Sequence, residues 1–135
     1  MGWTVINDDE FDPEFDALPE GVRDEILALR ILLQRHGPQL GRPHVDTLNG
    51  SKHANLKELR FNADDGVWRV AFAFDPERKA VLLIAGDKSG QSEAKFYRAL
   101  IAKADKRYDR HLADLKARQK AGRKPKEKRH GKKSR

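Results

Sequence analysis

Apolar residues recur along this chain with two different periods, and the changes of period predict its elements. Between Pro19 and Gly37 the apolar side chains keep the spacing of one helix face, at Val22, Ile26, Leu29 and Leu33. Pro19 at the start and Gly37-Pro38 at the end are helix boundaries, so we expect an amphipathic helix here. An apolar run at residues 2–7 predicts a strand before it, and Asp12-Pro13 predicts a helical turn.

In the second half of the chain, the apolar positions first follow the spacing of strands and then return to the spacing of a helix. Residues 56–61, 67–74 and 80–85 are apolar-rich runs, and Asp65-Gly66 between the first two is a hairpin signal. The last run is almost unbroken, which predicts a central strand buried on both faces. Ser92 can cap a final helix, whose apolar stripe holds Tyr97, Leu100, Ile101, Ala104, Tyr108, Leu112 and Leu115. Residues 38–55 are rich in turn-forming residues and predict a long loop.

This order of elements predicts one α+β domain over residues 1–117. We expect a small, antiparallel-rich twisted sheet, made of an N-terminal strand and a three-stranded meander, with helices packed on one face. Alternation in the middle strand puts its bulky side chains under the helices, at Trp68, Val70, Phe72 and Phe74. The other face of the sheet is then open.

Two arginines are predicted to lie side by side on this open face. Alternation in residues 56–61 turns Arg60 away from the helices, and alternation in the next strand turns Arg69 the same way. Alanines near Arg69 leave room for a ligand. The plainer alternative is that both arginines are solvated surface residues paired with Glu58 or Asp87.

A further cation, Lys88, lies between two glycines in residues 86–92, directly before the final helix. Free N–H groups at a helix N-terminus attract phosphate, so this loop predicts a phosphate-binding corner. The spacing is not that of a P-loop, so hydrolysis of a nucleoside triphosphate has no support. Tyr97 either packs in the core or points its hydroxyl into the same corner.

Charge is distributed unevenly along the 135 residues, which carry 28 Lys and Arg against 21 Asp and Glu. Residues 118–135 contain ten Lys and Arg, one Glu, and no Val, Leu, Ile, Met, Phe, Trp or Tyr. This composition predicts a disordered tail that contacts nucleic-acid phosphates nonspecifically, or one that only adds solubility. Residues 8–25 are strongly acidic, and one hypothesis is that they fold over the cations of the open face.

Several classes of function lack support in the sequence. The chain has no cysteine, which excludes disulfides, thiolate metal sites and cysteine nucleophiles. His44 and His53 have no partners at metal-ligand spacing, and no Gly-x-Ser-x-Gly signature occurs, so we expect no metal, no cofactor and no acyl transfer. Membrane-spanning and signal-peptide patterns are not found either, so we expect a cytoplasmic protein with no membrane partner.

Three motifs follow one another in the second half of the chain. They are Leu-Lys-Glu-Leu-Arg-Phe at 56–61, Trp-Arg-Val-Ala-Phe at 68–72 and Leu-Leu-Ile-Ala-Gly-Asp-Lys at 82–88. In this order, and before a closing helix, they resemble the RelE/ParE toxin superfamily, and its HigB-like, phage-derived branch in particular. The resemblance covers about residues 12–112. It implies a type II toxin with a compact sheet, helices on one side and a functional open face.

The resemblance also implies a metal-independent endoribonuclease that cleaves mRNA, in association with the ribosome, by attack of the RNA 2′-hydroxyl on the adjacent phosphodiester. The family's catalytic residues match Arg60, Arg69, Lys88 and Tyr97, and Lys57 and His53 match less closely as RNA-binding residues. Lys52, which is next to His53, is predicted to bind RNA with them. Either Tyr97 or His53 would transfer protons. Because the ordinary pKa of tyrosine is about 10, Tyr97 can accept a proton only if adjacent cations favour its ionised form. A protein antitoxin is the implied partner.

The sequence departs from the family pattern at two places. Glu58 stands where several ribosome-dependent members carry a basic residue, and residues 86–90 hold one cation where others have two. Two other functions remain: a ParE-like, non-catalytic inhibitor of a DNA topoisomerase, and a nonenzymatic RNA-binding protein driven by the basic tail. The inhibitor branch largely lacks the basic and tyrosine residues that this chain has at Lys88 and Tyr97, which favours RNA cleavage.

Overall fold

Five strands and three α-helices make up the chain in this computed structural model, which describes residues 2–128 and the side chains of residues 2–122. In chain order the elements are β1 (Thr4–Asn7), α1 (Phe11–Asp16), α2 (Glu20–His36), a 3-10 turn η1 (Gly37–Gln39), β2 (Val45–Thr47), β3 (Leu56–Ala63), β4 (Gly66–Phe74), β5 (Lys79–Asp87) and α3 (Glu93–Lys128). The α+β class and the three strands of the meander are confirmed. Strand β2 lies inside the segment that the sequence predicts as a loop.

The strands form one mixed sheet in the order β1-β5-β4-β3-β2, in which β1 runs parallel to β5 and the other neighbours are antiparallel. Strand β5 lies between β1 and β4, and its side chains from Ala80 to Leu83 are fully buried. This confirms the predicted central strand. In the β3–β4 ladder Arg60 is directly opposite Arg69, so the two arginines share one face as alternation predicts.

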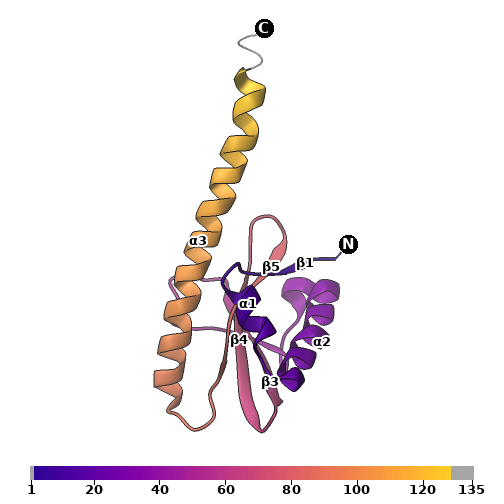
Figure 1. Cartoon of the computed structure of the whole chain (residues 1–135), viewed down its shortest axis with the longest axis vertical. Coiled ribbons are helices and arrows are strands. Elements are labelled where there is room, and N and C mark those ends of the chain that lie inside the picture. Colours follow the sequence, from indigo (N-terminus) through magenta and orange to yellow (C-terminus); the bar gives the residue numbers. More distant parts are fainter. Residues whose placement is uncertain (1, 129–135) are drawn as a thin grey trace.

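Helices cover both faces of the sheet, which corrects the prediction that they pack on one face only. Helix α2 packs on the face that carries Val70 and Phe72, and α3 packs on the face that carries Ala71 and Ala73. Figure 1 shows α2 and α3 on opposite sides of the strands. The alanines that were expected to leave room for a ligand instead let α3 approach the sheet, and both are fully buried.

Helix α3 is long, and only its first part packs on the sheet. Among the side chains described, up to residue 122, Leu115 is the last buried one of α3, and beyond it the helix extends away from the sheet (Figure 1). Residues 118–128, which the sequence predicts as disordered, continue this helix, whereas residues 129–135 of the predicted tail lie outside the described residues. The domain boundary at residue 117 stays a prediction. No helix within residues 2–128 is long and apolar enough to cross a membrane.

Ion pairs with the N-terminal acidic segment fix α3 in place. The buried Arg107 donates to both oxygens of Glu14, at 2.8 and 2.6 Å, and to the carbonyl oxygen of Leu83 at 2.7 Å. Arg110 pairs with Asp8 and Glu10 one turn later. These acids therefore bind the middle of α3. No ion pair found in the described part of the chain joins residues 8–25 to the predicted catalytic cations, so that hypothesis is wrong.

Candidate functional site

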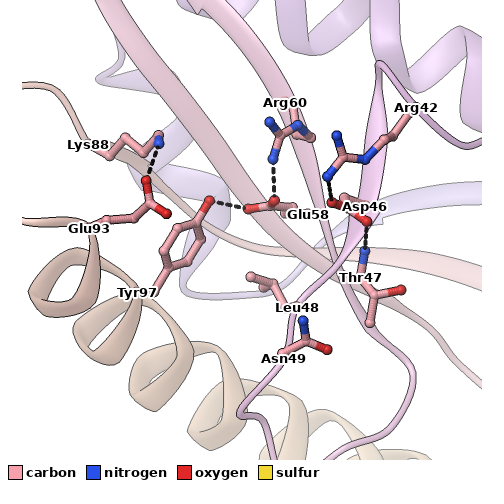
Figure 2. Close-up of a pocket in the computed structure, with 10 residues that line it drawn as sticks. All are labelled: Arg42, Asp46, Thr47, Leu48, Asn49, Glu58, Arg60, Lys88, Glu93 and Tyr97. Atoms are coloured by element: carbon pink, nitrogen blue, oxygen red, sulfur yellow. Dashed lines mark hydrogen bonds and ion pairs between the residues drawn. The ribbon is translucent and has the colours of Figure 1, made fainter.

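A cavity of about 410 Å³ opens beside the N-terminal turns of α3, where the helix meets β2, β3 and the end of β5. Figure 2 shows the side chains that converge on it from these elements. The cavity, called the Glu58 pocket below, is lined by Arg42, Asp46, Thr47, Leu48, Asn49, Glu58, Arg60, Lys88, Glu93 and Tyr97. Six of these ten residues have no role in the sequence prediction: Arg42, Asp46, Thr47, Leu48, Asn49 and Glu93.

Strand register and a helix cap place the central side chains. On β3, Glu58 and Arg60 are two residues apart and so point to the same face, the one that α3 partly covers. The Ser92 hydroxyl accepts the N–H of Lys95 at 3.1 Å and begins α3 where the sequence predicts its N-cap. Tyr97, on the second turn, then points its hydroxyl back at β3 (Figure 2).

The carboxylate of Glu58 is the centre of the site. Its side chain is only 4% exposed, and each of its two oxygens accepts a hydrogen bond. Arg60 Nη1 donates to Oε2 at 2.7 Å, and the Tyr97 hydroxyl donates to Oε1 at 2.8 Å. The buried Arg69 lies near the same oxygen, with 3.7 Å between its Nε and Oε1. Burying a carboxylate is costly unless it is paired and hydrogen-bonded, so the two arginines are what allow an acid at this depth.

Tyr97 stays protonated in this arrangement. Arg69 Nε donates to the phenol oxygen at 3.2 Å while the phenol donates to Glu58. Burial raises the pKa of Tyr97, and the hydrogen bond to Glu58 raises it further, against the opposing effect of Arg69. The expectation that adjacent cations favour the ionised form is therefore wrong, because the nearest group is a carboxylate as well as a cation. Tyr97 acts as a hydrogen-bond donor near neutral pH.

The cations at the rim of the pocket are each paired with an acid (Figure 2). Lys88 Nζ donates to Glu93 at 3.0 Å, and this hydrogen bond is the main reason why the pKa of Glu93 is lowered. Arg42 donates to Asp46 at 2.6 Å. A phosphate that enters the pocket must therefore compete with carboxylates for these donors.

The loop before α3 supplies Lys88, and several of its other donors are used within the loop. The N–H and the hydroxyl of Ser89 both donate to Asp87, at 2.9 and 2.6 Å, and these bonds lower the pKa of Asp87. Asp87 also accepts the N–H of Val67 at 3.0 Å, which ties the loop to β4. Of residues 86–92, Lys88 lines the Glu58 pocket, and the phosphate-binding role of this loop stays a prediction.

Four of the seven predicted site residues come together, and three do not. Arg60, Arg69, Lys88 and Tyr97 surround Glu58. Lys57 is opposite Phe72 in the ladder, so it lies on the α2 face of β3. Lys52 and His53 contact Asp109, which is 12 residues beyond Tyr97 on α3, or about 18 Å along the helix.

The sequence suggests Glu58 only as an ion-pair partner of the two arginines, and both do lie beside its carboxylate. A signal for a larger role exists, because the alternation that turns Arg60 outward also turns Glu58 outward, and a carboxylate buried in a sheet needs partners. Arg42 and Asp46 have no comparable signal, because they belong to a segment without periodicity. Among the described residues, His, Asp and Glu form no group of three that could hold a metal ion.

Sequence comparisons place this chain among phage-derived proteins. The family model described as Phage derived protein Gp49-like (DUF891) matches residues 13–109. A Mycobacterium tuberculosis protein named as toxin HigB2 is 36% identical over 116 residues, which are 85% of this chain and 57% of that protein. A second M. tuberculosis protein, named as toxin HigB3, is 48% identical over 82 residues, 61% of this chain and 69% of that protein. The chain thus spans just over half the length of the first relative.

A comparison of folds gives a compatible result. The structure of an arginine double mutant of the E. coli toxin RelE in the free state matches with a TM-score of 0.54 and 14% identity. The match covers 76% of this chain and 97% of that one. At this identity the match shows a shared fold.

Proposed function

Because the chain belongs to the phage-derived Gp49-like family, the HigB-like branch of the RelE/ParE toxins, we propose that it is a toxin of a toxin–antitoxin system that cleaves mRNA. The observation that carries the chemical part of this proposal is the buried Glu58 carboxylate, held by Arg60 and Tyr97 in a pocket with cations at its rim. A carboxylate that is held beside phosphate-binding cations can accept the proton of an RNA hydroxyl.

Glu58 is the general base in this mechanism. It takes the proton of the 2′-hydroxyl while the 2′-oxygen forms a bond to the adjacent phosphorus. The bond from phosphorus to the 5′-oxygen then breaks, and the products are a 2′,3′-cyclic phosphate and a 5′-hydroxyl. No water or co-reactant is consumed in this step.

Tyr97 is the proton donor to the leaving group. In the resting site its proton is held by Glu58 at 2.8 Å, but a protonated Glu58 no longer attracts it. The phenol can then protonate the leaving 5′-oxygen, and Arg69, at 3.2 Å, stabilises the phenolate that this leaves. Transfer of the new proton from Glu58 to the phenolate restores the resting state.

The cations stabilise the negative charge that develops on phosphorus. In this mechanism the charge is met by Arg60 and Lys88, which line the pocket, and by Arg69, whose Nε is 3.7 Å from Glu58 Oε1, and each well-placed donor lowers the barrier by about 3 kcal/mol. Lys88 is freest to reorient, since its partner Glu93 is largely exposed. The acids at the rim keep these cations in place until an RNA phosphate replaces them.

The proposed partners follow from the proposed substrate. A toxin that cuts mRNA, with or without the ribosome, acts in the cytoplasm and requires an antitoxin that neutralises it. A protein antitoxin could do so by covering the mouth of the Glu58 pocket or by displacing the first turns of α3. Cations of residues 116–128 would add nonspecific contacts to RNA phosphates.

Primer extension on mRNA with and without ribosomes tests the proposal, with the wild type and Glu58→Gln compared. Glu93→Gln is the matched control, since it removes an equal charge at the rim and leaves the proposed base intact. We expect cuts by the wild type and by Glu93→Gln and none by Glu58→Gln. Codon-phased cuts that need ribosomes would define a ribosome-dependent nuclease, and cuts in naked RNA a free one. Absence of cuts under both conditions contradicts the proposal, and a topoisomerase relaxation assay then tests the ParE-like alternative.

A further inference from the structure

The loop between β2 and β3 forms one wall of the Glu58 pocket, and α3 forms the opposite wall. Thr47, Leu48 and Asn49 line the pocket from the loop side, and Glu93 and Tyr97 line it from the helix (Figure 2). The width of the pocket therefore depends on where this loop is held against α3.

Two aspartates of α3 hold the loop. The Ser51 hydroxyl donates to Asp105 Oδ1 at 2.5 Å, and the backbone N–H of Lys52 donates to Asp105 Oδ2 at 3.3 Å. His53 Nε2 lies 2.8 Å from Asp109 Oδ1, and the Lys52 ammonium pairs with the other oxygen of Asp109. Three successive loop residues are thus bound by two carboxylates that are one helical turn apart on α3.

Contacts within the loop make it a single unit. Ser51 Oγ accepts the N–H of His53 at 2.9 Å, so one hydroxyl joins the two ends of the anchored segment. Gly50 has φ +98°, which other residues rarely adopt, and it allows the turn between Asn49 and Ser51. The His53 ring packs edge-on against Tyr108, with 4.9 Å between ring centroids.

The aspartate pair has no evident use within α3 itself. Like charges four residues apart on a helix repel each other, so Asp105 and Asp109 disfavour the helix unless a group outside it compensates. Lys52 is that group: its hydrogen bond is the main reason why the pKa of Asp109 is lowered, and the carboxylate stays an acceptor at neutral pH. The pair is explained by the loop that it holds.

We propose that Asp105 and Asp109 are positioning residues that anchor residues 51–53 and so set the distance between the loop wall and Tyr97. The inference rests on the proposed RNA cleavage and deepens it. Neither aspartate lines the Glu58 pocket, so both act through the loop. Lys52 and His53, which the sequence assigns to RNA binding, serve here to anchor the loop.

Amide hydrogen exchange and cleavage kinetics of Asp105→Asn/Asp109→Asn test this assignment. Asp114→Asn is the control variant. It also removes an aspartate charge from α3, but at a position beyond the loop contacts. With two to three hydrogen bonds lost, the amides of residues 49–53 should exchange about tenfold faster or more in the double variant, and at the wild-type rate in the control. In cleavage, KM should rise about fivefold or more while kcat changes by less than about twofold.

Two results would overturn the inference: unchanged exchange of residues 49–53 in the double variant, or the same acceleration in Asp114→Asn. A loss of kcat with an unchanged KM would also contradict a positioning role. Asp109→Glu, which keeps the acceptor, should stay close to the wild type in exchange. If the wild type cuts no RNA, the proposed function fails, yet the exchange measurement still decides whether the aspartates hold the loop.

Discussion

The hydroxyl of Tyr97, on the second turn of α3, donates a 2.8 Å hydrogen bond to the carboxylate of Glu58 on β3. This bond joins the final helix to a strand 39 residues earlier and closes one side of the pocket. Arg69 contacts both groups from β4, so a base, a proton donor and a cation meet at one point.

Ionisation of the two tyrosines gives a first test of this geometry. Burial is the main cause that raises the pKa of both Tyr97 and Tyr108 above the ordinary 10.0. A raised pKa in the folded state means that this contribution to stability is complete below pH 10 and is lost as the pH rises above it. Ultraviolet titration should show ionisation midpoints above pH 10 for both tyrosines in the folded protein. A tyrosine that ionises below its value in urea would contradict the hydrogen bond to Glu58.

Tyr97→Phe tests the phenol as the proton donor. The variant keeps the ring but loses both hydrogen bonds, and we expect kcat for RNA cleavage to fall by about 10² with little change in KM. Tyr108→Phe is the control, because its hydroxyl donates to the Phe74 carbonyl at 3.3 Å, far from Glu58. Equal effects of the two substitutions on kcat would show that Tyr97 has only a structural role.

Glu93→Gln should strengthen RNA binding, since Glu93 competes with phosphate for Lys88. The pair is exposed on the Glu93 side, so the expected gain in affinity is about two- to fivefold at low salt, and smaller at high salt. A titration with a 2′-deoxy oligonucleotide, which cannot be cut, measures it. Glu20→Gln changes an exposed acid at the start of α2 and should leave affinity unchanged. Weaker binding by Glu93→Gln would mean that this acid does not compete with RNA.

Arg107→Ala should lower the free energy of unfolding by about 3 kcal/mol, because it leaves the Leu83 carbonyl and Glu14 without their donor. Urea denaturation measures this loss, and the exposed Arg98→Ala should stay within about 0.5 kcal/mol of the wild type. A loss of similar size in both variants would contradict the specific role of Arg107.

The same ion pair has a pH signature. The hydrogen bond from Arg107 is the main cause that lowers the pKa of Glu14 below the ordinary 4.5. A lowered pKa in the folded state stabilises the protein above the ordinary value, and this stability is lost as the pH falls below it. The acid branch of the stability curve should therefore be shallower in Arg107→Ala than in the wild type. An identical acid branch would show that Glu14 is not coupled to Arg107.

Much of the fold is predictable from the sequence because its periodic signals are strong. The α2 stripe identifies the residues of that helix that the structure buries, and alternation in β4 correctly separates Val70 and Phe72 from Ala71 and Ala73, although both faces of β4 are buried. The position of α3 is not predictable in this way, because a stripe shows which side of a helix is buried but not which face of the sheet it covers. The unbroken run at 80–83 was the one indication that both faces are covered.

The candidate site was only partly predictable, for a related reason. Strand alternation identifies Arg60 and Arg69 as neighbours, and the sequence offers Glu58 as their partner, but it does not show that Tyr97 binds the same carboxylate. Nor does the sequence show that Lys52 and His53 face α3, since their position depends on a loop with no period. Arg60, Arg69 and Tyr97, which periodic segments place, come together as predicted. Lys57 does not, because alternation in β3 puts it on the α2 face, and Lys52 and His53 are placed by loop contacts that have no period.

Cleavage of an mRNA with one 2′-deoxy substitution is the most direct test of a Glu58-centred nuclease. The nucleotide on the 5′ side of a mapped cut is replaced, and the ends of the fragments are identified by mass spectrometry. We predict that the cut at that position disappears, and that unsubstituted RNA yields a 2′,3′-cyclic phosphate and a 5′-hydroxyl. Cleavage at the deoxy position, or fragments with a 5′-phosphate, would contradict attack by the 2′-hydroxyl and the role of Glu58 as its base.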